Sequence, residues 1–127
     1  MHIALLLLVH GSPKSNANDP IKKVLEDIRA RGEVDIAELG YLECNDPDIP
    51  AVLEQCVTRG AERVICVPCF LHPGNHVIND IPEILCDAGK KHPEVEFLLT
   101  PFLGSSPQIT EILMERARQA QSGRTST

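Results

Sequence analysis

Runs of consecutive apolar residues alternate along this chain with stretches in which apolar residues recur every three or four positions. The first pattern is typical of buried parallel strands, and the second of amphipathic helices. We predict four strands from the apolar runs, at residues 3–9, 34–42, 63–71 and 95–101. We predict four helices from the periodic stretches, at residues 20–31, 49–59, 77–91 and 108–120.

Local signals mark both ends of the first predicted helix. Asn18 or Asp19 can cap its N-terminus, and Gly32 follows its last residue, where glycine commonly ends a helix. One face of this helix is apolar at the i, i+3, i+4, i+7 spacing: Ile21, Val24, Leu25 and Ile28. We expect the helix to bury that face against a sheet.

The repeated order of strand and helix requires parallel strands joined by right-handed crossovers. We therefore predict an α/β fold, an open parallel sheet of about four strands with helices on both faces. At 127 residues the chain is long enough for one substantial core. We expect a single domain over residues 1–120 and a disordered tail at residues 121–127, which are small and polar.

Three polar residues each fall just past a predicted strand: His10, Glu43 and His76. The carboxyl ends of parallel strands lie at one edge of a sheet, where open α/β folds bind their ligands. Two imidazoles and a carboxylate at that edge can bind a divalent metal and accept protons. We therefore take these residues as the candidate site, with a solvated loop carboxylate as the alternative reading of Glu43.

A further histidine, His72, lies four residues before His76, which is the spacing of a zinc-binding pair on a helix. Pro73 and Gly74 lie between the two and disfavour a helix there. We therefore favour His76 as the site residue and expect His72 to be an auxiliary loop residue. The other histidines are expected to lie away from this edge: His2 and His92.

The loop after the first predicted strand begins with Gly11, Ser12 and Pro13. Its backbone N–H groups can hold carboxylates or another anion. Ser12 as a nucleophile with His76 as its base is disfavoured, because the Gly-x-Ser-x-Gly elbow is absent. The chain also lacks the GxxxxGK[ST] and GxGxxG motifs, so we predict no nucleotide cofactor.

Charge and the N-terminal sequence narrow the range of partners. The net charge is −6 and no basic stripe with interleaved aromatic residues is present, so we predict no nucleic-acid partner. The apolar segment Met1–Val9 is far shorter than the roughly 20 residues of a membrane span, and it lacks the basic start of a signal peptide. We expect no membrane association and a cytoplasmic location.

The five cysteines are an odd number without a framework spacing, which favours reduced thiols. Cys66 and Cys69 match the redox pattern CxxC, but they lie inside an apolar run, and residues three apart in a strand point to opposite faces. We predict that both are buried structural thiols. Cys44, beside Glu43, is either a soft accessory metal ligand or, as we favour, a packed thiol.

Several segments carry a family resemblance: residues 8–12, 41–43 with 47–50, 67–82 and 101–104. The most specific part is Gly74-x-His76 followed by Asp80-Ile81-Pro82. In these segments, and over residues 3–120 as a whole, the chain resembles the small class II tetrapyrrole chelatases. These are the short sirohydrochlorin cobalt or nickel chelatases.

The resemblance implies an enzyme that inserts Co²⁺ or Ni²⁺, with Fe²⁺ as a further option, into sirohydrochlorin or a related tetrapyrrole without ATP. It implies that His10 and His76 bind the incoming metal, with Glu43 as partner carboxylate and proton acceptor. It also implies a homodimer, as formed by the short members of the family, and a role in tetrapyrrole or cobalamin biosynthesis. Three residues are then candidate contacts for the acid side chains of the ring: Gly11, Ser12 and Lys14.

Two positions depart from the family pattern, and two other functions use the same residues. Val9 stands where the family usually has Gly, and residues 104–107 occupy a stretch where many relatives carry a further His. A carrier or sensor would bind a divalent metal at the same site without turnover. A histidine phosphatase is disfavoured, because its chemistry needs Arg before His10 and the chain has Val9.

Overall fold

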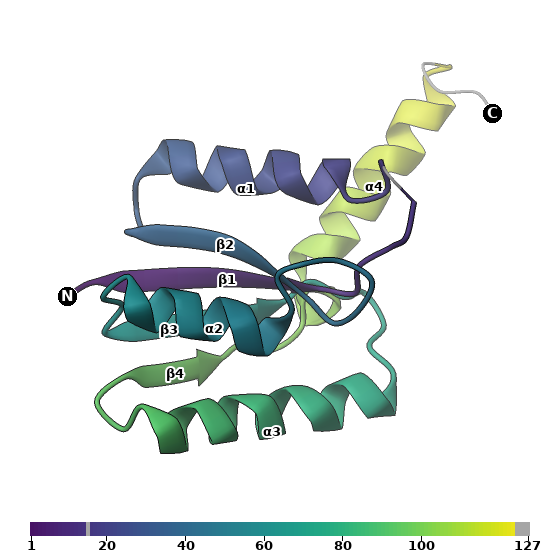
Figure 1. The fold of residues 1–127 in the computed structure, drawn as a ribbon. Coiled ribbons are helices and arrows are strands. Elements are labelled where there is room, and N and C mark those ends of the chain that lie inside the picture. Colours follow the sequence, from purple (N-terminus) through teal and green to yellow (C-terminus); the bar gives the residue numbers. More distant parts are fainter. Residues whose placement is uncertain (15, 124–127) are drawn as a thin grey trace.

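The computed structural model describes residues 1–14 and 16–123, except for the side chains of His76 and Ile78. Its centre is a four-stranded parallel sheet with the strand order β2-β1-β3-β4 (Figure 1). The strands are β1 (Ile3–Val9), β2 (Ile36–Tyr41), β3 (Arg63–Pro68) and β4 (Glu96–Leu99). The helices are α1 (Asp19–Arg31), α2 (Ile49–Thr58), α3 (Asn75–Lys91) and α4 (Gln108–Gln121), with a short 3₁₀ helix, η1 (Leu103–Ser105), before α4.

The predicted α/β fold is confirmed, since every predicted strand and helix is present in the predicted order. The outer strands and β3 are shorter than the apolar runs that predicted them. β3 ends at Pro68 rather than Leu71. The Cys69 N–H still donates to the Leu8 carbonyl at 2.8 Å, and Phe70 packs against the core from the loop. The apolar run therefore extends into the loop, where Cys69 and Phe70 are partly buried and Leu71 is exposed.

The ends of the helices differ slightly from the prediction. Gly32 ends α1 in the left-handed conformation, at φ 67°, as predicted, whereas Asn18 occupies the N-cap position without a side-chain hydrogen bond to the helix. α3 begins at Asn75, two residues earlier than predicted. The predicted tail begins at Gln121, which is the last residue of α4, and residues 124–127 lie outside the described residues.

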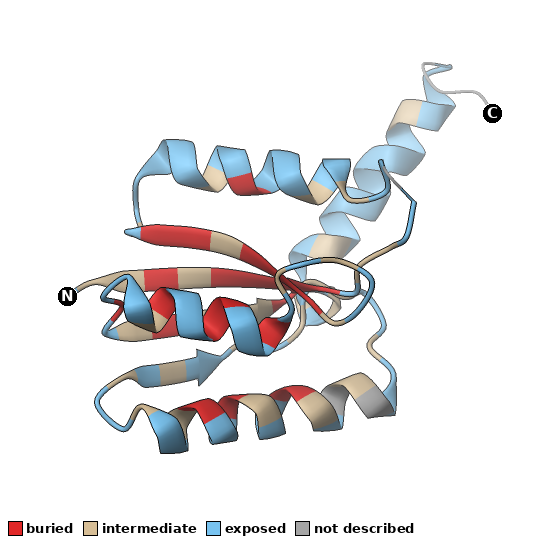
Figure 2. Ribbon diagram, viewed as in Figure 1, coloured by how far each residue is buried: buried red, intermediate tan, exposed pale blue. Residues whose placement is uncertain are grey.

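Alternate residues of β1 enter two separate apolar clusters. Leu6 and Leu8 point to the face that α2 and α3 cover, and both are completely buried. Leu7 and Val9 point to the opposite face, where they pack with Leu25 of α1. Figure 2 shows the buried positions concentrated in β1, β2 and the sheet-facing sides of α2 and α3. The central strand β1 is thus held from both faces.

The chain reverses its direction across the sheet at β1. It passes from β1 to β2 on one side, and β3 then pairs with β1 on the other side. A reversal of this kind opens a crevice at the carboxyl ends of the two strands concerned, where open α/β sheets bind ligands. His10 follows β1 directly, and His72 lies in the loop after β3.

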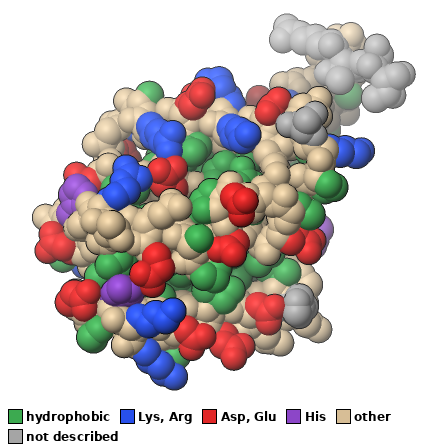
Figure 3. All heavy atoms as spheres, viewed as in Figure 1, with side chains coloured by type: hydrophobic (Ala, Val, Ile, Leu, Met, Phe, Trp, Pro, Cys, Tyr) green, Lys and Arg blue, Asp and Glu red, His purple; other side chains and the backbone are tan. Residues whose placement is uncertain are grey.

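The surface over α2 carries charges of both signs. Figure 3 shows carboxylates and Lys or Arg side chains interspersed over this face, with apolar side chains between them. Among the helices of the described residues, none is both long enough and apolar enough to cross a membrane.

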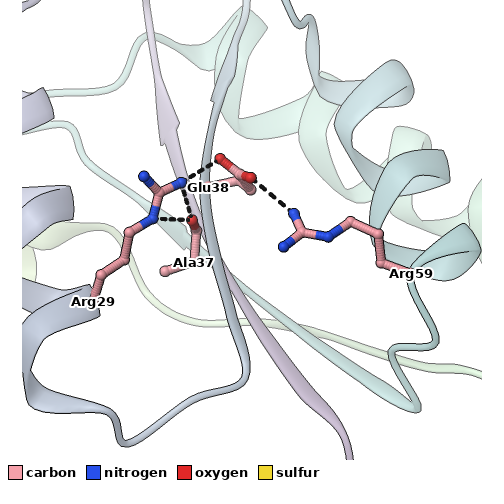
Figure 4. Close-up of polar contacts among 4 residues, drawn as sticks. All are labelled: Arg29, Ala37, Glu38 and Arg59. Atoms are coloured by element: carbon pink, nitrogen blue, oxygen red, sulfur yellow. Dashed lines mark hydrogen bonds and ion pairs between the residues drawn. The ribbon is translucent and has the colours of Figure 1, made fainter.

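A charged cluster ties the edge strand β2 to the helices on both faces (Figure 4). Arg29 of α1 donates from Nε and Nη2 to the carbonyl oxygen of Ala37, at 3.0 and 2.7 Å, and from Nη2 to Oε1 of Glu38 at 2.6 Å. Arg59, which follows α2, donates to the other oxygen of Glu38 at 2.9 Å. The Arg29 guanidinium thus satisfies a carbonyl of an edge strand, where strand partners are missing on the outer side.

The Glu38 cluster is expected to contribute to stability more than an ordinary surface ion pair does. We expect Glu38→Gln to lower the free energy of unfolding by about 1 kcal/mol, because it weakens contacts to two arginines at once. Asp27→Asn is the matched control, since it removes one carboxylate charge from the exposed Lys23–Asp27 pair on α1. It should leave the stability unchanged within error. Urea unfolding followed by circular dichroism measures both, and equal effects would contradict the role given to Glu38.

Candidate functional site

The strand pairing of β1 with β2 brings His10 and Glu43 side by side. Val9 lies opposite Tyr41 in the parallel register, so the two strands end at the same level. The pairing continues beyond them, since the Leu42 N–H donates to the Val9 carbonyl at 2.9 Å and the Glu43 N–H to the His10 carbonyl at 3.1 Å. Two loops that each carry a candidate site residue therefore leave the sheet together.

The side chains of His10 and Glu43 are in contact. Nδ1 of His10 lies 3.3 Å from Oε1 of Glu43, and the two side chains are 58% and 62% exposed. A carboxylate at Nδ1 favours the tautomer that carries its proton there, which leaves the lone pair of Nε2 available to a metal ion. The pair therefore has the arrangement of a histidine ligand oriented by a carboxylate.

An aromatic ring from the loop after β3 also contacts His10. The rings of Phe70 and His10 lie edge to face, with their centroids 6.4 Å apart and their planes at 89°. Phe70 also lines an apolar pocket of about 250 Å³ between the ends of β3 and β4 and α3, together with Val77, Leu99 and Phe102. The imidazole thus lies between a carboxylate and the wall of an apolar hollow.

Gly11 allows the two loops to approach closely. Its φ is +92°, and a Cβ atom at this position would lie 2.0 Å from the carbonyl oxygen of Glu43. The next amide, the N–H of Ser12, donates to Oδ1 of Asn45 at 2.7 Å, and the Lys14 N–H donates to Oγ of Ser12 at 3.2 Å. Two amides of the predicted anion-binding loop already have acceptors, so the binding of substrate by this loop stays a prediction.

The third candidate, His76, is the second residue of α3, and its side chain lies outside the described residues. α3 follows β3, so the backbone of His76 lies at the same edge of the sheet as the ends of the strands. His72 is exposed in the loop before it. Among the described side chains, no three His, Cys, Asp or Glu residues gather closely enough to hold a metal ion. The convergence of His76 with His10 and Glu43 therefore stays a prediction.

The remaining histidines lie at the opposite end of the sheet, as predicted. His2 precedes β1, and its Nδ1 lies 3.8 Å from Oδ2 of Asp35. His92 follows α3, and its Nε2 lies 2.9 Å from Oε1 of Glu54. Both are engaged with carboxylates far along the strands from His10.

The prediction of buried structural thiols is confirmed for Cys66, whereas Cys69 is only partly buried. Cys66 is fully buried on the face of α2 and α3, whereas Cys69 packs against the cluster under α1. Burial raises the pKa of Cys66 to about 12 and that of Cys69 to about 11, so neither forms a thiolate readily. The prediction that Cys44 is packed is wrong, because its backbone takes a φ of 69° in a tight turn and its side chain is exposed.

Two residues near His10 were not assigned to the site by sequence reasoning. Phe70 lay within an apolar run and was indistinguishable there from a core residue. Asn45 lay in a turn signal, Asn45-Asp46-Pro47, which predicts a change of direction and carries no information about a bond to Ser12. Only the pairing of distant segments brings these side chains to the site.

Comparison with solved structures defines the class of protein. SirB from Bacillus subtilis with Fe³⁺ superposes with a TM-score of 0.82 at 28% identity, over 94% of this chain and 48% of that chain. The sirohydrochlorin chelatase SirB of B. subtilis subspecies spizizenii, in complex with cobalt, gives a TM-score of 0.82 at 27% identity. This match covers 94% of this chain and 51% of that chain. The fold is that of a chelatase, and the chain spans about half the length of these proteins.

The sequence comparisons identify the family. The profile of the CbiX family matches residues 4–120. A sirohydrochlorin cobaltochelatase from Methanococcus aeolicus is 33% identical over 139 residues, covering 91% of this chain and 97% of that protein. One from Methanococcus maripaludis is 44% identical over 82 residues, 65% of this chain and 57% of that protein. The chain belongs to the CbiX family of small class II chelatases.

The five cysteine thiols should fall into two groups that differ in how fast they react with a thiol reagent. We expect Cys44 and Cys86, which are exposed, to react quickly with Ellman's reagent at about pH 8, because the reagent can reach both sulfur atoms. Cys56, Cys66 and Cys69 should react only on unfolding, because burial raises their pKa values to about 11, 12 and 11. The labelling time course in buffer and in denaturant measures this. A third fast thiol, traced to the CxxC pair by mass spectrometry, would contradict it.

Proposed function

We propose that this protein inserts a divalent metal into sirohydrochlorin or a related tetrapyrrole without ATP. The observation that carries the proposal is the His10–Glu43 contact of 3.3 Å at the ligand-binding edge of a CbiX-family chain. The names of the relatives from two Methanococcus species support sirohydrochlorin as the ring and cobalt as the metal. Imidazole ligands also suit Ni²⁺ and Fe²⁺, so these two ions are further candidates.

The reaction requires a metal ligand and a proton acceptor at the same place. The ion loses bound water and forms bonds to the ring nitrogens, while two pyrrole N–H groups release one proton each. His10 binds the ion through Nε2, because Glu43 occupies the Nδ1 side. Glu43 accepts the two pyrrole protons one after the other and passes each to water, to which its side chain is open. His76 provides the second imidazole in this proposal.

The substrate carries many acid side chains, for which the first loop offers contacts. Lys14 is exposed in this loop and provides a positive charge for a ring carboxylate. Gly11 and Ser12 lie between Lys14 and His10. Gly11 offers its backbone N–H to the substrate and Ser12 its hydroxyl, because the Ser12 N–H already donates to Asn45. Two imidazoles and one carboxylate leave coordination positions open, so the ring nitrogens can replace the remaining water on the ion.

We further propose that the protein acts as a homodimer with α4 in the interface. No residue of α4 is buried, and three of its apolar side chains are exposed by 48%, 63% and 49%: Ile112, Leu113 and Met114. Figure 2 shows this exposure along the helix, which extends away from the sheet. A 14-residue helix is marginal in water without packing on another surface. A second copy of this chain offers the same exposed apolar residues as a surface for this helix to pack on.

The proposal includes a cytoplasmic location. All five cysteines are unpaired, which suits a reducing compartment.

Turnover should depend on the three site residues. We expect His10→Ala and His76→Ala each to lower the rate of Co²⁺ insertion about 100-fold, because each removes a metal ligand. The rate is measured from the absorbance change of sirohydrochlorin with Co²⁺, corrected for the reaction without protein. His2→Ala is the matched control, since His2 lies at the other end of β1, and it should leave the rate within about twofold.

Glu43→Gln separates the two roles of the carboxylate. If Glu43 acts only as a proton acceptor, Glu43→Gln should lower turnover and leave the affinity for Co²⁺ unchanged. If Glu43 is a direct ligand, the substitution should lower both. Tight Co²⁺ binding by the wild-type protein without any acceleration of insertion would overturn the enzyme proposal and support a metal carrier. Acceleration that survives His10→Ala would overturn the assigned site.

The proposed dimer should depend on the apolar side of α4. We expect Leu113→Glu to convert a dimer into a monomer, because it places a charge in the centre of the apolar patch. Glu115→Gln should leave the dimer intact, since Glu115 lies two residues from Leu113 and therefore on nearly the opposite side of the helix. Light scattering after size-exclusion chromatography measures both masses. A monomeric wild-type protein, or a dimer that tolerates Leu113→Glu, would contradict this interface.

A further inference from the structure

The loops that carry His10 and Glu43 have little regular structure to hold them. The first loop joins β1 to α1 over residues 10–18, and the second joins β2 to α2 over residues 42–48. The backbone pairing between them ends at the Glu43 N–H, which donates to the His10 carbonyl. His10 and Glu43 are therefore the last residues that the backbone pairing of the two strands holds.

Asn45 connects the two loops beyond that point. Its Oδ1 accepts a hydrogen bond of 2.7 Å from the partly buried N–H of Ser12. Its own N–H donates to the Glu43 carbonyl at 2.9 Å. Apart from the His10–Glu43 contact, this is the one side-chain hydrogen bond between the two loops among the residues that the structure describes.

The backbone around Asn45 is held in an unusual conformation. Cys44, which separates Glu43 from Asn45, has a φ of 69°, in the left-handed region that non-glycine residues rarely adopt. Such a conformation costs about 1 kcal/mol or more and persists only where surrounding contacts determine it. The two hydrogen bonds of Asn45 are contacts of that kind.

Gly11 brings the backbone of the first loop close to Asn45 in the second loop. A Cβ on Gly11 would lie 3.0 Å from Oδ1 of Asn45, as well as 2.0 Å from the carbonyl oxygen of Glu43. The first loop is thus in close contact with the second loop beside Asn45. A small displacement of either loop changes the distance between His10 and Glu43.

We propose that Asn45 is a positioning residue for the His10–Glu43 pair, an inference that rests on the proposed function of this site. By holding Ser12 and the backbone of Glu43 together, it keeps the Glu43 carboxylate on Nδ1 of His10. Nε2 then keeps its lone pair directed away from Glu43 for the metal ion. Asn45 itself touches neither metal nor ring.

Three variants of Asn45 test this role. Asn45→Ala removes the acceptor of the Ser12 N–H, Asn45→Asp keeps an acceptor oxygen at the same reach, and Asn45→Gln moves the amide by one methylene. Asn16→Ala is the matched control, because Asn16 is exposed in the first loop and its side chain makes no hydrogen bond to the described residues. Thermal unfolding of each variant establishes that it is folded.

The first measurement needs neither metal nor substrate. Long-range ¹H–¹⁵N spectra at about pH 8.5, where imidazoles are ordinarily neutral, report which nitrogen of His10 carries the proton. His10→Ala identifies the signals. We expect the proton on Nδ1 in the wild-type protein, in Asn45→Asp and in Asn16→Ala. Asn45→Ala and Asn45→Gln should give a mixture of tautomers.

The second measurement is Co²⁺ affinity and insertion kinetics. We expect kcat to fall about tenfold in Asn45→Ala and Asn45→Gln, with Co²⁺ binding weakened to a similar extent and KM for sirohydrochlorin within about twofold. Asn45→Asp should stay within about threefold of the wild type, since the acceptor is kept.

The two measurements separate this inference from the proposed function. A wild-type tautomer in folded Asn45→Ala, or equal losses in Asn45→Asp and Asn45→Gln, would overturn the positioning role. If Asn45→Ala does not fold, the comparison of Asn45→Asp with Asn45→Gln alone decides whether Asn45 positions the pair. If the wild-type protein inserts no metal, the proposed function fails, while the tautomer of His10 still decides whether Asn45 positions the pair.

Discussion

The parallel pairing of β1 with β2 is the constraint on which the candidate site depends. Neighbouring strands lie about 5 Å apart, so residues that leave the two strands at the same level are held within reach of each other. Val9 opposite Tyr41 sets that level for His10 and Glu43. A slip of one residue would turn alternate side chains to the wrong face of the sheet and would separate the pair. Because β1 carries leucines on both faces, the register is held by β2, where Glu38 pairs with Arg29 and Arg59 and Gly40 leaves room for Val52.

Much of this arrangement could be predicted because it depends on local patterns. Apolar runs indicate buried strands, and strands alternating with helices indicate a parallel sheet with right-handed crossovers. Positions just after such strands then lie at the ligand-binding edge, which is how His10 and Glu43 could be proposed together. The same reasoning predicted that Cys66 and Cys69 lie on opposite faces, since alternation along a strand is a local property.

Contacts between distant segments could not be predicted in this way. Phe70 meets His10 only because β3 pairs with β1, and a single sequence does not reveal which strands are neighbours. Asn45 meets Ser12 across two irregular loops, and Cys44 is exposed because its turn has a positive φ that no residue type there signals. The periodicity of α4 predicts a helix with an apolar side, and it does not say what that side covers.

The exposure of the His10–Glu43 pair bears on the difference between moving a metal and keeping it. Structural metal sites are closed, with every coordination position filled by the protein. Here two side chains that are 58% and 62% exposed lie beside an apolar hollow lined by Phe70. Water can reach the carboxylate to remove a proton, and the open side of the imidazole can be approached by a flat ring. An ion held by so few groups gains additional bonds by passing to a macrocycle with four nitrogens. If His10 binds the ion as proposed, the open geometry of this edge favours its transfer over its retention.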